Sequence, residues 1–161
     1  MSSKRNGTPD WLSTDLVSEL DGCLWHATTS EAFEKIVSEG FIKIPDQSKY
    51  SNGFCRGIGA ISLFDLRYPD PPPYISHWSE WISRNPLKPS YWFEVDRELT
   101  KSSVLSPTEL LKRWRIEQNS ERVRIIAGIE SAHIGPLPLS HTRRTLKISY
   151  PHFEVIQRLV R

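Results

Sequence analysis

Apolar residues recur along the chain in short blocks whose spacing predicts both helices and strands. The clearest helical pattern is SEAFEKIVSEG at 30–40, in which three apolar residues share one face and Gly40 ends the helix. Thr28 and Glu31 have the spacing of a capping box at its start. Brief apolar blocks such as CLWHA at 23–27 predict buried strands instead, because they are too short for a stable helix.

Similar patterns of apolar and polar residues recur through the rest of the chain. Further helices are predicted at 11–20, 75–85 and 106–118. Further strands are predicted at 41–44, 60–64, 91–95, 121–129 and 144–150, followed by a terminal helix or strand. Glycine, proline and polar residues predict loops and turns at 45–59, 67–74 and 135–139. Strands and helices mix without a strict βαβ alternation, which favours an α+β fold over a doubly wound sheet.

Length and composition favour a single globular domain. The chain has 161 residues, of which 38% are hydrophobic, so 11–161 is expected to bury one core and 1–10 to form a flexible tail. No stretch approaches the roughly 20 apolar residues that span a bilayer, and 1–10 lacks the apolar core of a signal peptide. We therefore expect a cytoplasmic protein without a membrane partner, with Cys23 and Cys55 as free thiols.

The formal net charge of +2 does not by itself indicate a nucleic-acid-binding protein. The basic residues are nevertheless unevenly distributed, with one cluster past the middle of the chain and one near its end: Lys112, Arg113, Arg115, Arg122 and Arg124, then Arg143, Arg144 and Lys147. Such clusters usually form a solvated face. If their side chains converge, they suit a polyanionic partner and favour DNA or RNA over protein.

Common catalytic and metal-binding motifs are absent from the sequence. It contains no phosphate-binding loop, no G-x-G-x-x-G after a strand, no H-E-x-x-H and no G-x-S-x-G. Cys23 and His26 have the spacing of one metal-ligand pair, but no second pair accompanies them, so no metal site is expected. What remains is a series of predicted strands that carry His26, Arg67 and Glu121 at or near one end.

Three short motifs in this series resemble the ADP-ribosyltransferase superfamily, whose members cleave NAD⁺ at its nicotinamide bond and transfer ADP-ribose to an acceptor. The first is LWHATTSEAFEKIVSEGFI, a strand with histidine, a small residue and threonine before a helix. The second is the glycine-preceded strand RGIGAISLF, and the third is SERVRII, a glutamate opening a later strand. The resemblance covers most of 23–139 and implies an ADP-ribosyltransferase-like split mixed or antiparallel sheet, flanking helices and NAD⁺ as co-substrate.

Two departures narrow the resemblance. Ala27 follows the histidine where many relatives have glycine, and Ser62 stands where members with a His-Tyr-Glu pattern have tyrosine. The chain is more similar to the DarT-like toxins, which modify nucleic-acid bases, because FDLRYP supplies Arg67 and Pro69 after the second strand. This similarity implies a toxin, phage-defence or counter-defence role, and an antitoxin or immunity protein as a partner.

The resemblance also implies roles for individual residues around one cleft. Glu121 would stabilise the ribosyl cation and accept a proton from the acceptor, although a glutamate that opens a strand is often simply exposed. Arg67 would clamp the pyrophosphate or orient the acceptor; the alternative is a surface arginine. NAD⁺ would bind through ribose hydroxyls and aromatic stacking to residues of the first two motifs and the loop between them: His26, Ala27, Thr28, Tyr50, Phe54, Ser62 and Phe64.

Two alternatives explain parts of the sequence differently. RNA 2′-phosphotransferases share the superfamily and consume NAD⁺, but they carry a basic N-terminal domain, and this chain has little sequence before Cys23. A non-enzymatic inhibitor or adaptor would instead use exposed tryptophans as interface anchors. The candidate anchors are Trp78, Trp81, Trp92 and Trp114.

Overall fold

A computed structural model describes the protein at residues 14–44, 53–67, 87–117, 125–126, 128–149 and 152–156. The predicted tail at 1–10, the predicted helix at 75–85, and the candidates Tyr50 and Glu121 lie outside these residues. The described residues form a seven-stranded sheet, a separate two-stranded sheet and several helices. This architecture confirms the predicted α+β class.

Helices and strands follow one another in an irregular order. They are α1 (Thr14–Leu20), β1 (Leu24–Thr29), α2 (Ser30–Glu39), β2 (Phe41–Ile42), α3 (Phe54–Gly57), β3 (Ala60–Asp65), β4 (Ser90–Val95), α5 (Arg97–Thr100), β5 (Val104–Leu105), α6 (Pro107–Glu117), β6 (Glu130–Ile134), β7 (Leu137–Pro138), the 3₁₀ turn η1 (Leu139–His141), β8 (Thr142–Ser149) and β9 (His152–Ile156). Near the C-terminus, β9 decides the helix-or-strand alternative in favour of a strand.

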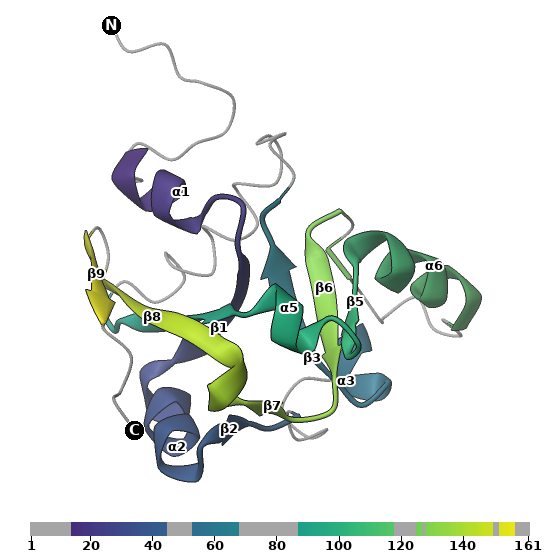
Figure 1. Cartoon of the computed structure of the whole chain (residues 1–161), viewed down its shortest axis with the longest axis horizontal. Helices are drawn as coiled ribbons and strands as arrows, with labels where there is room; N and C mark the ends of the chain where they lie inside the picture. Colours follow the sequence, from purple (N-terminus) through teal and green to yellow (C-terminus); the bar gives the residue numbers. More distant parts are fainter. Residues whose placement is uncertain are drawn as a thin grey trace, which may run out of the picture.

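The large sheet has the strand order β5-β6-β3-β1-β4-β8-β9, and β2 pairs with β7 in the small sheet. Every pairing among these described strands is antiparallel. In Figure 1 the large sheet extends across the molecule from β9 on the left to β5 and α6 on the right. No helix in the described part of the chain has both the length and the apolar character needed to cross a bilayer.

One face of the large sheet packs under α1. Paired residues of antiparallel strands point to the same side, so Trp25 of β1 and Trp92 of β4 share this face. The Trp25 indole N–H donates to Leu20 O at 2.9 Å, which attaches the end of α1 to the sheet. The apolar core on this face consists of Leu16, Leu20, Trp25, Leu66, Trp92, Ile129, Leu146 and Ile148.

The opposite face packs against α2 and the two-stranded sheet. Phe33 of α2 stacks on Tyr91 of β4, with 3.8 Å between the ring centroids. The buried core here consists of Leu24, Ile36, Ile42, Ile61, Leu63, Phe93, Val95 and Leu137. Because both faces are covered, the strands that carry the candidate site residues are held rigidly from either side.

A third apolar cluster lies at the β6 side of the sheet, where α3 and α6 pack. It joins Phe54 and Cys55 of α3 to Ala60 of β3, Leu110 of α6 and Ala132 of β6. The prediction of a loop over 45–59 is therefore wrong at α3, because two buried residues anchor a helical turn there. This cluster places α3 directly beside β3 and β6.

Helix α2 is capped by Thr29 and not by Thr28. Thr29 precedes the first helical residue, and its hydroxyl accepts a hydrogen bond from the Ala32 amide at 3.2 Å. Thr28 still belongs to β1, where it is buried and pairs with Tyr91. The predicted capping box therefore does not form, because the residue three positions after Thr29 is Ala32 and has no side-chain acceptor. Gly40 ends the helix as predicted, at a φ of 83°.

Of the late strand predicted at 121–129, the structure describes 125–126 and 128–129, and these residues are not in a strand. The described strand in this region is β6, which begins at Glu130. The described residues immediately before it form a turn, in which the amides of Ile129 and Glu130 both donate to Ile126 O. Gly128 has a φ of 89°, a left-handed conformation that glycine adopts without a steric penalty. The turn brings Glu130 into the sheet beside β3.

Replacing Thr29 with alanine should lower the free energy of unfolding by about 1 kcal/mol, because the Ala32 amide loses its capping acceptor. Thr29→Ser keeps the hydroxyl and should remain close to wild type. Urea unfolding followed by circular dichroism measures both variants. An equal loss in the two would contradict a capping role for the hydroxyl.

Candidate functional site

Strands β1 and β3 are neighbours in the large sheet, but they pair over only part of their length. Their register joins two residue pairs, of which Trp25 with Phe64 is the last. On their other sides, β1 continues to pair with β4, and β3 continues to pair with β6. We use the name ladder break for the stretches that do not pair with each other, 26–29 of β1 and 60–63 of β3.

Hydrogen-bond alternation shows which backbone groups face the ladder break. The Leu66 amide donates to Cys23 O, so the odd-numbered residues of β1 direct their N–H and C=O groups toward β3. Continuing this register would place Ala27 opposite Ser62. The backbone groups of Ala27 and the carbonyl of Ser62 therefore lie on the edges of the two strands that border the break.

The imidazole of His26 forms a hydrogen bond with the Ser62 carbonyl at the ladder break. Its Nδ1 lies 3.1 Å from Ser62 O, and because a carbonyl can only accept, Nδ1 must carry the proton. Burial lowers the pKa of His26 to about 4, against the opposing effect of this hydrogen bond. The ring is therefore neutral at pH 7, and its Nε2 is an acceptor.

Ser62 connects His26 to a carboxylate on the next strand. The Ser62 hydroxyl donates to Glu130 Oε2 at 2.9 Å, while the Ser62 carbonyl accepts from His26. The registers place His26 and Glu130 on opposite faces of the sheet. Ser62 is hydrogen-bonded to both side chains and so links them across the sheet. Ser62 itself is exposed.

Glu130 is a buried carboxylate held by three neutral donors. It is 8% exposed. Besides the Ser62 hydroxyl, Oε2 accepts from the Cys55 thiol at 3.1 Å, and Oε1 accepts from the Ile126 amide at 2.8 Å. The Ile126 contact closes the turn that leads into β6, so the local backbone and the carboxylate stabilise each other.

The charge of Glu130 is not neutralised by any lysine, arginine or histidine among the described residues. Glu94, a second buried glutamate on the same sheet, provides the contrast, because Arg143 and Arg144 lie 3.6 Å and 3.4 Å from its Oε2. A buried carboxylate without a cationic partner exerts a strong field on any positive charge that develops beside it.

Sequence reasoning missed Glu130 and selected Glu121, which lies outside the described residues and stays a prediction. The β-prone residues after Glu121 suggested that the strand begins there. The signal for Glu130 was the glycine two positions earlier: Gly128 marks a turn, and the first residue after a turn opens the following strand.

Ala27 and Phe64 lie on the face of the sheet that packs under α1. Ala27 pairs with Trp92 of β4, and its small side chain leaves room for the rings of Phe64 and Trp92 to stack above β1, with centroids 5.5 Å apart. Thr28 points to the opposite face, where it is buried. Of the three, Ala27 and Phe64 border the ladder break on the same face as Ser62.

Phe54 lies beside Ala60, at the β3 side of the ladder break, but it is part of the apolar core. Its ring is 5% exposed and packs in the third cluster with Leu110 and Ala132. The described contacts of Phe54 are therefore those of a core residue. Tyr50, the other aromatic residue expected to stack on a ligand, lies outside the described residues.

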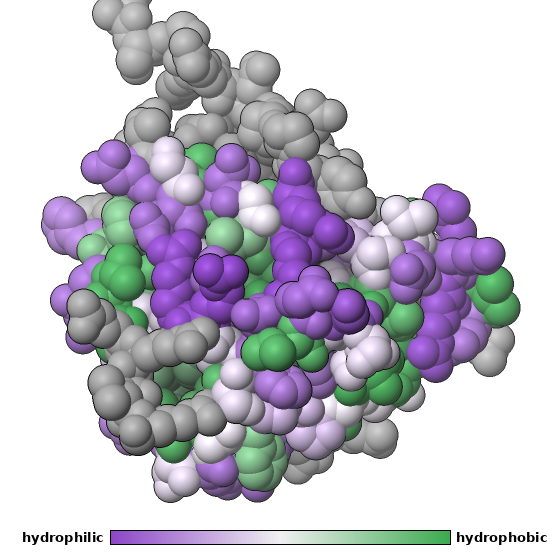
Figure 2. All heavy atoms as spheres, in the orientation of Figure 1, coloured by the Kyte–Doolittle hydropathy of each residue, from purple (hydrophilic) through white to green (hydrophobic). Residues whose placement is uncertain are grey.

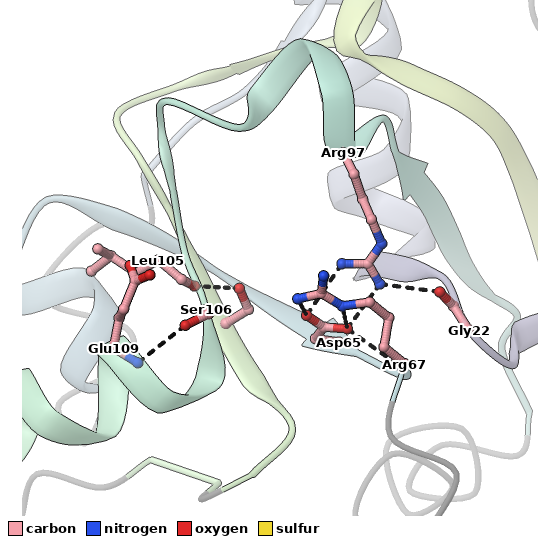
Figure 3. A network of polar contacts seen from close by, with 8 residues as sticks. Gly22, Asp65, Arg67, Arg97, Leu105, Ser106 and Glu109 are labelled. Carbon is pink, nitrogen blue, oxygen red and sulfur yellow. Dashed lines mark hydrogen bonds and ion pairs between the residues drawn. The ribbon is translucent and has the colours of Figure 1, made fainter.

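Arg67 is bound to Asp65 at the end of β3, as Figure 3 shows. Nε and Nη2 of Arg67 donate to the Asp65 carboxylate at 3.2 Å and 2.8 Å. Arg97 of α5 donates to the same carboxylate at 2.8 Å and 3.2 Å, and to Gly22 O at 3.1 Å. The network therefore ties β3 and α5 to the turn before β1.

The Asp65 network has two guanidinium groups for one carboxylate. Asp65 is 1% exposed, whereas the side chains of Arg67 and Arg97 are 48% and 31% exposed. Burial raises the pKa of Asp65, but hydrogen bonds and charges from Arg97 and Arg67 outweigh burial and hold that pKa below its ordinary value of 3.8. Because Asp65 pairs with Leu24, the network lies on the same face of the sheet as His26.

Helix α6 carries the described part of the first basic cluster. Lys112 and Arg115 are exposed, and Arg113 pairs with a glutamate one turn later at 2.9 Å. Figure 2 shows hydrophilic residues gathered over α6 at the right of the molecule. Because α6 packs in the third cluster with Cys55, its exposed charges lie at the side of the sheet that holds Glu130.

The residues of the second basic cluster form ion pairs with glutamates. Arg144 contacts Glu19 and Glu94, and Lys147 lies 3.9 Å from Glu154. Arg144 also lies over the Trp25 ring, 5.3 Å from its centroid. These residues stabilise the packing of α1 and β9 on the sheet, which is the ordinary structural explanation for such a cluster.

The described cysteines and histidines do not form a metal site. Within the described ranges, no three His, Cys, Asp or Glu side chains gather as metal ligands would. Cys23 and Cys55 are free thiols, and burial together with Glu94 raises the pKa of Cys23 to about 12. The Cys23 and His26 pair therefore has separate partners, Glu94 for the thiol and Ser62 for the imidazole.

The geometry of the ladder break is the basis on which a function can be assigned to this chain. No protein-family model matches the chain, and no curated protein is a significant relative of it. The features of the chain that bear on function are therefore His26, Ser62 and Glu130 and the charges around them.

Asp65→Asn should lower the free energy of unfolding by about 2 kcal/mol at pH 7, because Arg67 and Arg97 lose their shared anion. The pKa of folded Asp65 lies below 3.8, so the wild-type advantage is present above about pH 4 and is lost as pH falls through the folded value. Urea unfolding of both proteins across this range measures the difference.

The exposed Asp21→Asn is the matched control for Asp65→Asn and should stay within about 0.5 kcal/mol of wild type. A difference between wild type and Asp65→Asn that did not shrink in acid would contradict the ion-pair explanation.

The His26 ring should remain neutral, with its proton on Nδ1, from about pH 8 down to about pH 5. The reason is that burial lowers its pKa to about 4. Long-range ¹H–¹⁵N NMR distinguishes the two tautomers and the protonated ring, and His26→Gln identifies the signal. Titration with a midpoint near 6.5 would contradict the burial of the ring, and a proton on Nε2 would contradict the hydrogen bond to Ser62 O.

Proposed function

We propose that this protein is an NAD⁺-dependent ADP-ribosyltransferase whose active site is the ladder break. The observation that carries the proposal is the chain of contacts from His26 through Ser62 to Glu130, which joins a neutral imidazole to a buried carboxylate. Cleavage of the bond between nicotinamide and ribose calls for a group that orients the sugar and an anion that stabilises the ribosyl cation. An ADP-ribosyltransferase-like split sheet is part of the same proposal.

The nicotinamide group would bind where β1 separates from β3. Its carboxamide has N–H donors and a C=O acceptor, and the backbone of Ala27 offers the complementary pair on the strand edge that faces the break. Phe64, which stacks on Trp92 beside Ala27, supplies an apolar surface for the pyridine ring. This placement puts the bond to be cleaved near Ser62.

His26 and Glu130 would act on the ribose. Nε2 of His26 is an acceptor and would receive a hydrogen bond from a ribose hydroxyl, which orients the sugar. As nicotinamide leaves with the electrons of the glycosidic bond, the negative charge of Glu130 would stabilise the cation that forms. Glu130 would then accept the proton that the acceptor loses when its new bond to ribose forms.

The Asp65 network would bind the pyrophosphate of NAD⁺. Arg67 and Arg97 are positively charged, and the side chains of both are partly exposed to solvent. A planar guanidinium matches phosphate oxygens in geometry and charge. Asp65 lies on the His26 face of the sheet, so the network and the imidazole would bind different parts of one dinucleotide.

Nucleic acid is the acceptor class that we favour. Lys112 and Arg115 are exposed on α6, at the side of the sheet that holds Glu130, and exposed basic side chains bind phosphates in a salt-dependent way. A role as a toxin, defence or counter-defence protein, with an antitoxin or immunity partner, follows from the motif resemblance and belongs to the proposal on that ground alone.

The interface-anchor alternative depends on exposed tryptophans, and the described ones are poorly suited to that role. Trp92 is fully buried, and Trp114 packs against the third cluster. Trp78 and Trp81 lie outside the described residues. No described contact favours the RNA 2′-phosphotransferase alternative over transfer of ADP-ribose.

Incubation with ³²P-labelled NAD⁺ and separate pools of DNA, RNA and protein tests the proposal. We expect wild type to release nicotinamide and to label the nucleic-acid pools. Glu130→Gln should reduce the rate on the order of 10²-fold to 10³-fold, because the neutral amide no longer stabilises the cation. No label and no released nicotinamide from wild type would contradict the proposal.

Two further variants make the comparison specific. Glu94→Gln alters a buried glutamate on the same sheet that lies between two arginines, and it should retain activity when assayed below its melting temperature. Glu121→Gln tests the glutamate selected from the sequence. If Glu121→Gln were inactive and Glu130→Gln fully active, the carboxylate would have been assigned to the wrong residue.

A further inference from the structure

The three donors that hold Glu130 come from three different segments and occupy most of its acceptor positions. Oε2 receives the Cys55 thiol of α3 and the Ser62 hydroxyl of β3, whereas Oε1 receives the Ile126 amide alone. A carboxylate has about four lone-pair positions. Both positions on Oε2 are therefore filled by described donors, and the remaining acceptor position is on Oε1.

Cys55 is held in place to act as one of these donors. It is 2% exposed and belongs to the third apolar cluster, so neighbouring side chains restrict its rotamer. Burial, together with the adjacent charge of Glu130, raises the pKa of the Cys55 thiol well above its ordinary range. The group is therefore a thiol and not a thiolate at neutral pH, and toward a carboxylate it can only donate.

A second thiol and carboxylate pair in the same sheet shows what is particular to Cys55. Cys23 lies beside Glu94, another buried glutamate, which raises the pKa of the thiol, but Glu94 also has Arg143 and Arg144 as cationic partners. Glu94 would keep its place without the thiol. Glu130, in contrast, has neutral donors for all its described contacts, so each of them matters more for its orientation.

We propose that Cys55 is a positioning residue for the carboxylate of Glu130: with Ser62 it saturates Oε2, so that Oε1 is the oxygen directed at the ribose. The inference rests on the proposed transferase function and deepens it. Cys55 does not touch the substrate and forms no covalent intermediate. Its thiol remains protonated throughout, and it acts only through the direction in which it holds Glu130.

Steady-state kinetics of NAD⁺ cleavage with Cys55→Ala, Cys55→Ser and the matched control Cys23→Ala test the role. Cys55→Ala should lower kcat about tenfold or more with KM within about twofold of wild type, because a hydrogen bond to a charged group is lost at the reacting carboxylate. Cys55→Ser keeps a donor and should restore kcat to within about threefold of wild type. Cys23→Ala should leave kcat unchanged.

Melting temperatures of all three variants separate positioning from simple destabilisation. A purely structural role predicts that Cys55→Ala and Cys23→Ala change kcat alike at a temperature where both are folded, or that serine fails to restore kcat. Either result would overturn the proposal. Selective loss in Cys55→Ala with rescue by serine would support it.

Infrared spectroscopy of the S–H stretch gives a readout that does not depend on turnover. A thiol that donates to a carboxylate absorbs at lower frequency than one that donates to an amide, so the Cys55 band, identified by its absence in Cys55→Ala, should move to higher frequency in Glu130→Gln. If wild type released no nicotinamide but the band moved, the transferase function would fail while the contact stood. If the frequency of the Cys55 band were the same in wild type and Glu130→Gln, the positioning proposal itself would be overturned.

Discussion

Strands β1 and β3 share two residue pairs and then stop pairing, and the arrangement of the candidate site depends on that interruption. A continuous ladder would join Ala27 to Ser62 through backbone hydrogen bonds. Here the His26 imidazole donates to the Ser62 carbonyl instead, which leaves Ser62 exposed and its hydroxyl directed at Glu130. A side-chain hydrogen bond therefore takes the place of a backbone hydrogen bond between the two strands. This leaves polar backbone groups at an edge inside an otherwise continuous sheet.

Three buried carboxylates near this edge are stabilised in different ways, and the differences suggest different roles. Asp65 is surrounded by Arg67 and Arg97 and joins separate segments of the fold. Glu94 is likewise paired with arginines, on the side of the sheet that carries α1. Glu130 has hydroxyl, thiol and amide donors as its described partners, and this difference from Asp65 and Glu94 is the reason for proposing it as the group that faces the ribosyl cation.

The sequence predicts the local elements better than it predicts which residues meet. The periodicity of α2 and the apolar block of β1 are strong local signals, and both elements form, although the cap is Thr29 and not Thr28. Glu130 was not selected from the sequence, because the β-prone residues before Gly128 predicted a strand across the turn that precedes β6. The contacts of Ser62 with His26 and Glu130 depend on strand order and register, which composition and spacing do not reveal.

A crystal structure of Glu130→Gln with NAD⁺ bound tests the central claim most directly. We expect the nicotinamide ring at the ladder break, with its carboxamide on the Ala27 backbone and a ribose hydroxyl on Nε2 of His26. The side-chain amide that the substitution introduces should lie beside the bond between nicotinamide and ribose. NAD⁺ bound at another surface of the protein, or β1 and β3 closed into a continuous ladder with no dinucleotide between them, would contradict the account.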